Sequence, residues 1–533
     1  MKKISILLSL ALSLSAVSCD EWLDINSDPN SVADIENNSI LLPAVELNLM
    51  SVTGFYGHLL GSYYAEQYAI KPGGPQYLGL SHWDTKDGTL GSTWSNRLYT
   101  SAYQKVANNA KKIRENAAES ESWGDYLAAT ILMVYNYQIL VDGFGEIPYS
   151  EALNPSNIAP KYDDGKDVYA SLIAELDTAL AKVSFTDVVC DNMLFSSSSD
   201  INNWIKFGNA LKLKLLMREC DTVDVKSKLD ALIAEDNFPE SDIMFKSSVW
   251  TNQAGKDNPV FSELVRQRGD IKTGRTIEIC AHMAVTATMQ EVSDTNRLAA
   301  KFVPSVAYNN FEGDFIDEQQ SKEINAGKLD EDTYAELNIK YDTPIYFLTV
   351  AETDFFIAEY YAKANLGNDA AKAKEYYEKA IDASFATHGV EGAADIYGAG
   401  KKYAWDSTKA LELIGIQKWI ALANINGFES WCELRRLGYP AFNSKTGAEI
   451  YEKWDELAKA NVAANKANPT PLAQDLIDAG VYTPGTIFTP VYVVGLPDNT
   501  LLGRLPYVTS SRTTNANAPQ KQKAPKDKVF WAK

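Results

Sequence analysis

Long stretches of this chain repeat apolar residues at the spacing of one helix face, and this periodicity limits the fold more than any other feature. In residues 41–68, Leu42, Val45, Leu49 and Val52 recur every three or four positions, which matches an α-helical turn of ~3.6 residues. Comparable stretches predict further helices at residues 93–118, 123–140, 168–183, 204–218, 347–366, 369–385 and 416–422. The sequence therefore predicts a mostly α-helical protein.

One pair of these stretches has the spacing of a tetratricopeptide-type helical hairpin. Gly367-Asn368 separates the two predicted helices. In the second, Ala373, Tyr377 and Ala380 lie where small residues admit close helix packing and an aromatic ring fills the gap. Residues 167–183 show a fainter version of the pattern. We therefore expect helical hairpins of this type to form the scaffold.

Charged residues within two of the helical stretches predict structural roles. Residues 204–218 alternate leucines with Lys/Arg, as in a half-buried helix whose cations lie at the rim. Further along, Arg435 and Arg436 are expected to form charge-assisted bonds to Glu429 or Glu433 and to fix a turn against the helices. No phosphate-binding loop accompanies these arginines, so the structural role is favoured over catalysis.

Helical periodicity weakens between about residues 238 and 344, where aromatic and polar residues are interleaved. A long irregular region inside a folded protein is usually functional or disordered. Its aromatic content argues against disorder. We interpret it as a loop-rich insert in the helical scaffold.

The first residues of the chain predict export and a lipid anchor. Two lysines, a short apolar run and small residues precede Cys19, in the order of a secretory signal. A cysteine at this point can accept a diacylglyceryl group, and two or three acyl chains together hold a protein at a membrane, at ~0.8 kcal/mol per buried methylene. We predict a lipoprotein signal peptide at 1–18, a lipidated flexible leader at 19–40 and a single domain at 41–533. The alternative is a plain signal peptide with an incidental cysteine.

Charge and cysteine content narrow the class of protein further. Lys and Arg total 50 against 70 Asp and Glu, a net charge of −20, which argues against binding to nucleic acid. Four further cysteines leave a disulfide and free thiols equally open: Cys190, Cys220, Cys280 and Cys432. None of the four histidines is spaced as a metal-binding pair, so no metal and no cofactor is expected: His58, His82, His282 and His388.

Several tracts resemble the SusD/RagB family of outer-membrane nutrient-binding lipoproteins. The first is CDEWLDINSDPN at residues 19–30, and the strongest are QKW at 417–419 and WCELRRLGYP at 431–440. The hairpin at 349–384 and RLPY at 504–507 are similar too. The resemblance implies a SusD-like, mostly α fold with long irregular ligand-binding loops, a cell-surface position at the outer membrane, and a SusC-like TonB-dependent transporter as partner.

A carbohydrate site needs aromatic planes for the apolar C–H faces of a sugar and polar side chains for its hydroxyls. The loop at residues 76–91 and the insert have that composition. For every one of these residues an ordinary packing role is the alternative. The candidate ligand-binding residues are Tyr77, Trp83, Asp84, Trp250, Arg266, Tyr308, Asn309 and Phe311.

We expect a protein that binds nutrient oligosaccharides without cleaving them and delivers them to the transporter. The chain lacks the sequence motifs of nucleophilic serine, phosphate-loop and zinc-protease sites. Three alternatives remain open: binding of peptide instead of glycan, hydrolysis of glycosidic bonds by a lipid-anchored carboxylate pair, and docking of other proteins on a helical-repeat scaffold.

Overall fold

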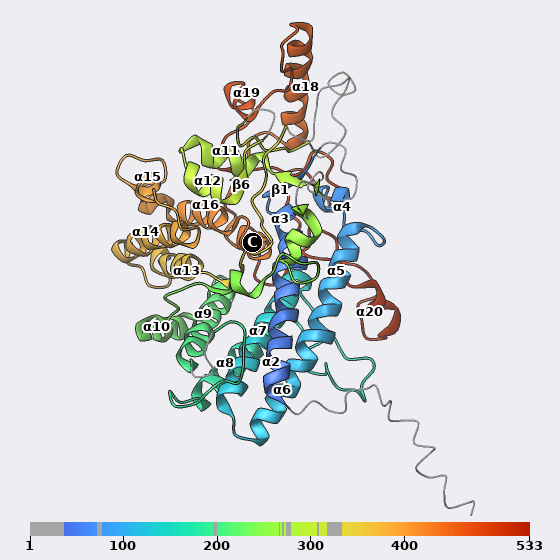
Figure 1. Cartoon of the computed structure of the whole chain (residues 1–533), viewed down its shortest axis with the longest axis vertical. Coiled ribbons are helices and arrows are strands. Elements are labelled where there is room, and N and C mark those ends of the chain that lie inside the picture. The colour runs from blue at the N-terminus through green and yellow to red at the C-terminus, as the bar shows by residue number, and fades with distance from the viewer. Residues whose placement is uncertain are drawn as a thin grey trace, which may run out of the picture.

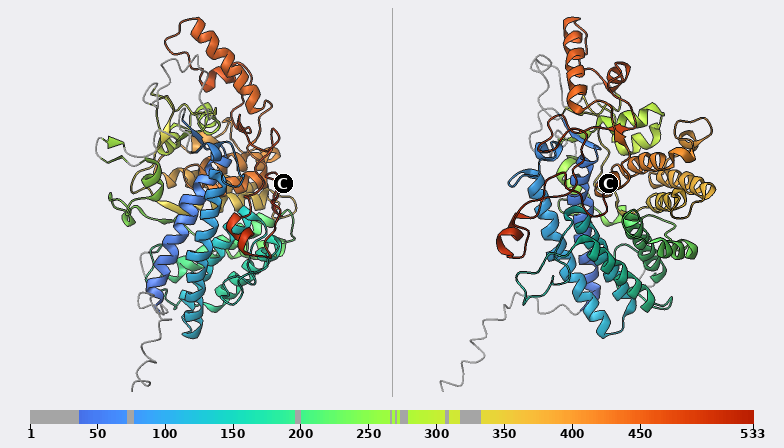
Figure 2. Two further views of the ribbon diagram at one scale, coloured as in Figure 1. Left: turned by 90° about the vertical axis from the view of Figure 1, so that its right-hand side faces the viewer. Right: turned by 180° about the vertical axis from the view of Figure 1, so that it is seen from behind.

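Two long helical rods lie side by side along one edge of the molecule (Figures 1 and 2). The computed structural model describes residues 37–71, 77–195, 200–265, 267–268, 271–272, 279–305, 309–316 and 333–533. One rod joins α2 (Asn38–Ser51), the π-helix η1 (Val52–Gly57) and α3 (His58–Tyr64). The other joins α5 (Leu90–Ser101), the π-helix η3 (Ala102–Ala107) and α6 (Asn108–Glu119). The helices predicted at residues 41–68 and 93–118 are therefore both present, each with a π-helical turn at its middle.

The helix α7 (Trp123–Phe144) runs through the centre of the lower body. It is long and apolar enough to cross a membrane, as is the α2–α3 rod, but here α7 is enclosed by other helices. Gly145 ends it with φ at 77°, a left-handed conformation that a glycine adopts without strain. Three helices follow in sequence: α8 (Gly165–Lys182), α9 (Ile201–Glu219) and α10 (Lys226–Glu235).

The predicted insert is where most of the strands lie. The described strands of the chain form two-stranded sheets, among them β1 against β5 and β2 against β8. One prediction here is wrong: Phe347 belongs to strand β8, not to a helix, because its segment pairs with β2 before α13 begins. The elements from residue 68 to 348, besides those above, are β1 (Tyr68–Ile70), α4 (Leu78–Ser81), β2 (Ile243–Phe245), η4 (Ser247–Val249), η5 (Phe261–Val265), β3 (Gln267–Arg268), β4 (Ile271–Lys272), β5 (Ile279–Ala281), α11 (Met283–Glu291), α12 (Thr295–Lys301), β6 (Phe302–Val303), β7 (Glu336–Leu337) and β8 (Ile345–Leu348).

The tetratricopeptide-type hairpin is present as α13 (Val350–Ala362) and α14 (Ala370–Thr387). Ala373, Tyr377 and Ala380 are fully buried, as their spacing predicts. A second helical pair, α16 (Ala410–Leu422) and α17 (Gly427–Leu437), packs beside it. The short α15 (Ala394–Tyr397) and η7 (Ser407–Lys409) connect the two pairs.

The rest of the chain builds a projection at one end and an extended tail. The helix α18 (Gly447–Ala463) projects at the top of Figure 1 and encloses a smaller apolar core with α19 (Ala473–Asp478) and α11. β9 (Ala441–Phe442) pairs in parallel with β10 (Thr486–Ile487). The tail beyond it holds one short helix, α20 (Thr509–Thr514), and returns across α7 and α17.

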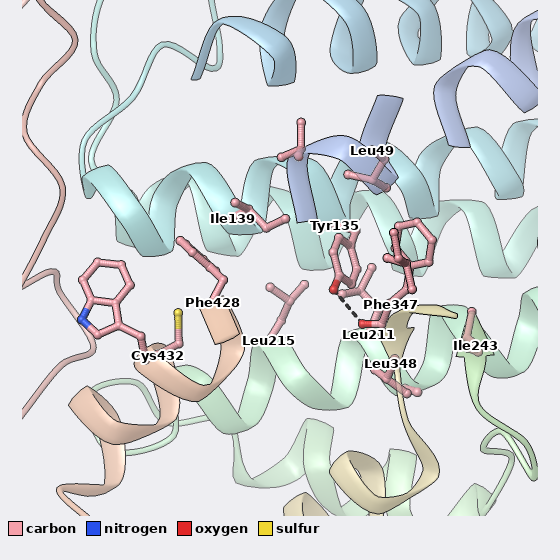
Figure 3. Close-up of a cluster of buried hydrophobic side chains, with 14 of the residues drawn as sticks. Leu49, Tyr135, Ile139, Leu211, Leu215, Ile243, Phe347, Leu348, Phe428 and Cys432 are labelled. Carbon is pink, nitrogen blue, oxygen red and sulfur yellow. Dashed lines mark hydrogen bonds between the residues drawn. The ribbon is translucent and has the colours of Figure 1, made fainter. Parts of the chain in front are cut away.

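The main core lies where α7, α9, α17 and the strand β8 meet (Figure 3). Tyr135 of α7 donates a hydrogen bond of 2.6 Å to the backbone oxygen of Phe347. Leu211 and Leu215 of α9 lie in the same core, where they face Phe428 of α17 and the pair formed by Tyr135 and Phe347. A helical body with strand-bearing loops laid over it is the SusD-like arrangement that the sequence predicts.

Five cations and five carboxylates form a buried ion network between α7, α9, α13, α16 and α17. None of them is more than 7% exposed. Lys214 is held by Glu352 at 2.6 Å, and Arg218 by Glu429 at 2.5 Å. The network consists of Lys214, Arg218, Lys363, Lys418, Arg436, Asp142, Glu352, Glu359, Glu429 and Glu433.

The network corrects two predictions from the sequence. Lys214 and Arg218 lie inside the protein and not at the rim of α9, because carboxylates of α13 and α17 meet them there. Arg436 does bind Glu433, at 2.6 Å. Arg435 pairs with no carboxylate of the described residues: it donates to backbone oxygens, at 2.8 Å to that of Gly503, and lies over the ring of Trp431.

Candidate functional site

Close packing on one side of the α2–η1–α3 rod leaves aromatic residues on the other. A Cβ added at Gly54 would lie 2.2 Å from Ile345, and one at Gly61 would lie 2.2 Å from the backbone of Gly427. Only glycine permits such an approach. Phe55 and Tyr56, which follow Gly54 within the π-helical turn, remain partly exposed to solvent.

These two residues belong to an aromatic cluster of Phe55, Tyr56, Tyr77 and Trp94. The ring centroids of Phe55 and Trp94 are 5.1 Å apart with planes at 70°, and those of Tyr56 and Trp94 are 5.6 Å apart at 63°. Tyr77 closes the cluster at 6.4 Å from Trp94. Edge-to-face contacts of this kind hold rings rigidly. Trp94 is buried and supports Phe55 and Tyr56 at the surface, and the buried Tyr77 packs against Trp94 from within the protein.

Charged groups stand at the edge of the aromatic cluster. The guanidinium of Arg97, an exposed residue of α5, lies 5.7 Å from the centre of the Trp94 ring. The hydroxyl of Tyr77 donates to a carboxylate oxygen of Glu263 at 3.2 Å. A sugar ring has apolar C–H faces and hydroxyl groups. The partly exposed rings can pack against the first, and the guanidinium and carboxylate at the edge of the cluster can bind the second.

Of the candidates in the loop at residues 76–91, two are buried. Trp83 is 0% exposed, and its indole donates to the backbone oxygen of Tyr63 at 3.2 Å. Tyr77 is also 0% exposed and lies in the aromatic cluster. Asp84 is partly exposed and accepts a hydrogen bond from the backbone of Lys86 at 3.0 Å. In this structure Trp83 packs and presents no ring face to solvent.

The candidates in the insert are dispersed. Trp250 is partly buried, 6.3 Å from the ring of Phe245. Asn309 is exposed with φ at 51°, and Phe311 packs partly buried against the main core. Arg266, Tyr308 and the proposed lipidation site Cys19 lie outside the described residues. Of the six candidates that the structure describes, only Tyr77 joins the aromatic cluster.

The residues that sequence analysis missed are Phe55, Tyr56, Trp94 and Arg97. Tyr56 and Trp94 lie within the stretches predicted as helices at residues 41–68 and 93–118, and neither was named as a binding residue. The signal that was available is the Gly-Phe-Tyr-Gly run at 54–57, where glycines interrupt a helical stretch. A π-helical turn often marks a functional site, but its presence in a helix cannot be read from the apolar period.

No metal centre is found within the part of the chain that the structure describes: no three His, Cys, Asp or Glu residues gather in a way that could hold an ion. The four cysteines beyond the leader carry free thiols. Burial lowers the pKa of His58 to about 4 and that of His282 to about 3, so both imidazoles are neutral at physiological pH.

Comparisons with known proteins agree with this architecture. Residues 30–454 match the model of a SusD-like family described as starch-binding and associating with the outer membrane. A SusD homolog from Bacteroides uniformis is 18% identical, with 92% of this chain and 99% of that chain aligned at a TM-score of 0.67. A chitin-binding SusD homolog from Flavobacterium johnsoniae is 19% identical, with 93% and 96% aligned at a TM-score of 0.63.

A SusD-like protein from Bacteroides thetaiotaomicron is also similar, at 19% identity and a TM-score of 0.63 over 93% of this chain and 99% of that chain. None of the curated proteins matches the chain. At these identities the solved structures show a shared fold and no more. The family model, in contrast, matches well over half of the sequence, and the chain therefore belongs to the SusD-like family.

Proposed function

We propose that this protein is a lipid-anchored cell-surface protein that binds nutrient oligosaccharides and delivers them to a SusC-like TonB-dependent transporter. The family description of starch binding and outer-membrane association supports this, as does the chitin-binding relative. The observation that carries the proposal to named residues is the aromatic cluster, which offers Phe55 and Tyr56 to solvent beside Arg97.

Binding at the aromatic cluster requires no chemical step. The C–H face of a sugar ring packs on Phe55 and Tyr56, and apolar burial contributes ~25 cal/mol per Å² removed from water. Arg97 donates hydrogen bonds to hydroxyl groups at the edge of the ring. Because Trp94 already packs against both partly exposed rings, little side-chain entropy is lost on binding.

The structure favours binding over glycoside hydrolysis. A glycosidase needs two accessible carboxyl groups facing each other across the scissile bond. The carboxylates of the buried ion network, Glu429 and Glu433 among them, are inaccessible and neutralised by Lys and Arg. Burial alone would raise the pKa of Glu433, but three surrounding cations hold that pKa well below its ordinary value, so Glu433 is not a proton donor.

The lipid anchor at Cys19 and delivery to the transporter rest on the sequence and the family resemblance. Mass spectrometry of the protein from its native membrane tests the first: we expect an acylated amino-terminal Cys19 with residues 1–18 removed. Co-purification with a TonB-dependent barrel tests the second. An unmodified, retained leader would overturn the anchor.

Calorimetric titration against neutral glycans and peptides tests the binding site. We expect a glycan to bind, with affinity reduced at least tenfold in Phe55→Ala/Tyr56→Ala. Phe185→Ala is the matched control, because Phe185 is 74% exposed and lies after α8, outside the cluster. Unchanged binding in the double variant would remove the site, binding of peptides alone would favour the peptide alternative, and release of shorter sugars would favour hydrolysis.

A further inference from the structure

A cavity of about 250 Å³ lies beside the loop at residues 76–91, between that loop and two segments of the C-terminal tail. It is smaller than the ~300–1,000 Å³ typical of sites for drug-sized ligands, so it suits a single sugar residue. Its walls contain three cations and one acid. The lining residues are Thr85, Lys86, Asp87, Arg504, Leu505, Pro506, Gln522, Lys523 and Pro525.

The positive charge of these walls is only partly neutralised. Lys86 is exposed and forms no ion pair within the part of the chain that the structure describes. Asp87, the one acid of the lining, is already bound by Thr509 at 2.9 Å and by Arg512 at 3.2 Å. The lining therefore has an excess of two positive charges in a chain whose net charge is −20.

Arg504 is fixed in the wall before any ligand arrives. It is 4% exposed, donates to Glu146 at 2.9 Å and to the backbone oxygen of Phe144, and lies 4.6 Å over the ring of Tyr507. Its Nε is buried and has no hydrogen-bond acceptor among the described residues. A guanidinium held in this way loses little freedom when it binds an anion.

Glu146, which is not part of the lining, orients two of the cations. It accepts from Arg504 and lies 3.5 Å from the ammonium of Lys523. Burial alone would raise the pKa of Glu146, but hydrogen bonds from Tyr507 and Arg504 and the charge of Arg504 lower it to about 2. Glu146 therefore stays ionised and positions the cations without occupying the lining.

We infer that this cavity binds the anionic substituent of an acidic sugar residue, either the carboxylate of a uronic acid or a sulfate ester. Lys86 supplies an exposed cation with no ion pair among the described residues, Lys523 supplies an exposed cation that Glu146 orients, and Arg504 supplies a fixed cation in the wall. Leu505, Pro506 and Pro525 give the sugar ring an apolar surface. The inference rests on the proposed glycan-binding function and names a class of glycan within it.

The test is calorimetric titration of the full-length protein with an oligogalacturonide, a sulfated galacto-oligosaccharide and the neutral galacto-oligosaccharide. The variant is Lys86→Gln/Lys523→Gln, and the matched control is Lys228→Gln/Lys379→Gln, which alters two exposed lysines of α10 and α14. We expect at least one acidic oligosaccharide to bind tenfold or more tightly than the neutral one in low salt. That preference should disappear in Lys86→Gln/Lys523→Gln and persist in the control.

The two acidic ligands distinguish carboxylate from sulfate, and the salt dependence of the preference should disappear in the same variant. Equal binding of acidic and neutral oligosaccharides, or an acidic preference that survives the variant, would overturn the inference. If the inference fails but the neutral oligosaccharide binds, and only Phe55→Ala/Tyr56→Ala abolishes that binding, the proposed function still stands. If none of these sugars and no neutral glycan binds, both proposals fail.

Discussion

The buried ion network and the aromatic cluster are both built on the same helical scaffold, yet they differ in what they expose to solvent. In the network, cations and carboxylates saturate one another and no member is more than 7% exposed. In the aromatic cluster, the buried Trp94 packs against two partly exposed rings and against the guanidinium of the exposed Arg97. We therefore assign the buried charges to maintaining the fold, and we propose binding only for the smaller set of aromatic residues at the surface.

The largest effect should come from breaking the network. Glu433 contacts three cations: Arg218, Lys418 and Arg436. Glu433→Gln should lower the free energy of unfolding by about 3–5 kcal/mol, because it leaves buried positive charge uncompensated. Chemical denaturation measures this. Glu375→Gln is the control: Glu375 pairs with Lys379 at the surface, and its loss should cost less than about 1 kcal/mol. Equal costs would contradict the structural role of the network.

Trp83→Ala should be nearly as damaging and separates a buried aromatic from an exposed one. Trp83 is fully buried and hydrogen-bonded to Tyr63, so its truncation should cost about 3–5 kcal/mol of unfolding free energy. At a temperature where the variant is still folded, its glycan affinity should match that of the parent protein. If the variant were stable but bound glycan more weakly, Trp83 would be a ligand-binding residue, contrary to this interpretation.

Glu46 tests what happens to a buried carboxylate outside the network. It is 0% exposed on α2, accepts from the backbone of Met193 at 2.7 Å, and forms no ion pair with the described residues. Burial raises its pKa from 4.5 to about 8. The folded protein therefore keeps a proton that the unfolded chain loses between about pH 4.5 and 8, and stability should fall as the pH rises through that window.

Glu46→Gln should remove this decline. The free energy of unfolding of Glu46→Gln should exceed that of the parent protein by an amount that grows from pH 5 to pH 8, with a slope of at most about 1.4 kcal/mol per pH unit. Unfolding curves recorded at several pH values measure it. A parent protein whose stability rises over that range, with no change in slope in Glu46→Gln, would show that Glu46 is ionised in the fold.

The smallest change in stability should come from the aromatic cluster itself. Tyr56 is partly exposed, so Tyr56→Ala should cost about 1 kcal/mol of unfolding free energy or less. Glycan affinity should nevertheless fall by about tenfold, since a stacking surface is removed. Thermal unfolding and calorimetric titration of the same sample separate the two effects. Tyr56→Phe, which keeps the ring, should retain most of the affinity.

The helical scaffold was predictable because its helices repeat apolar residues over many turns. The helix predicted at 123–140 is found at Trp123–Phe144, and the tetratricopeptide-type hairpin follows from the spacing of Ala373 and Tyr377. The burial of Lys214 could not be foreseen, because its partner Glu352 is remote in sequence and only the tertiary fold brings them together.

The candidate site was predicted less well for a similar reason. Loop composition identifies aromatic residues but not which of them are covered, so Trp83 was proposed although it is buried. Phe55 and Tyr56 were missed because a π-helical turn shifts residues off the regular apolar face. The division into leader and domain, and the lipid on Cys19, stay predictions.

The most direct test of this account compares glycan affinity in two variants, Glu433→Gln and Phe55→Ala/Tyr56→Ala, by calorimetric titration under conditions where both are folded. We predict that the first binds glycan as the parent protein does despite its lower stability. The second should lose at least tenfold in affinity with a smaller loss of stability than the first. The reverse pattern, in which the network variant loses binding and the aromatic variant keeps it, would contradict the separation of scaffold and site.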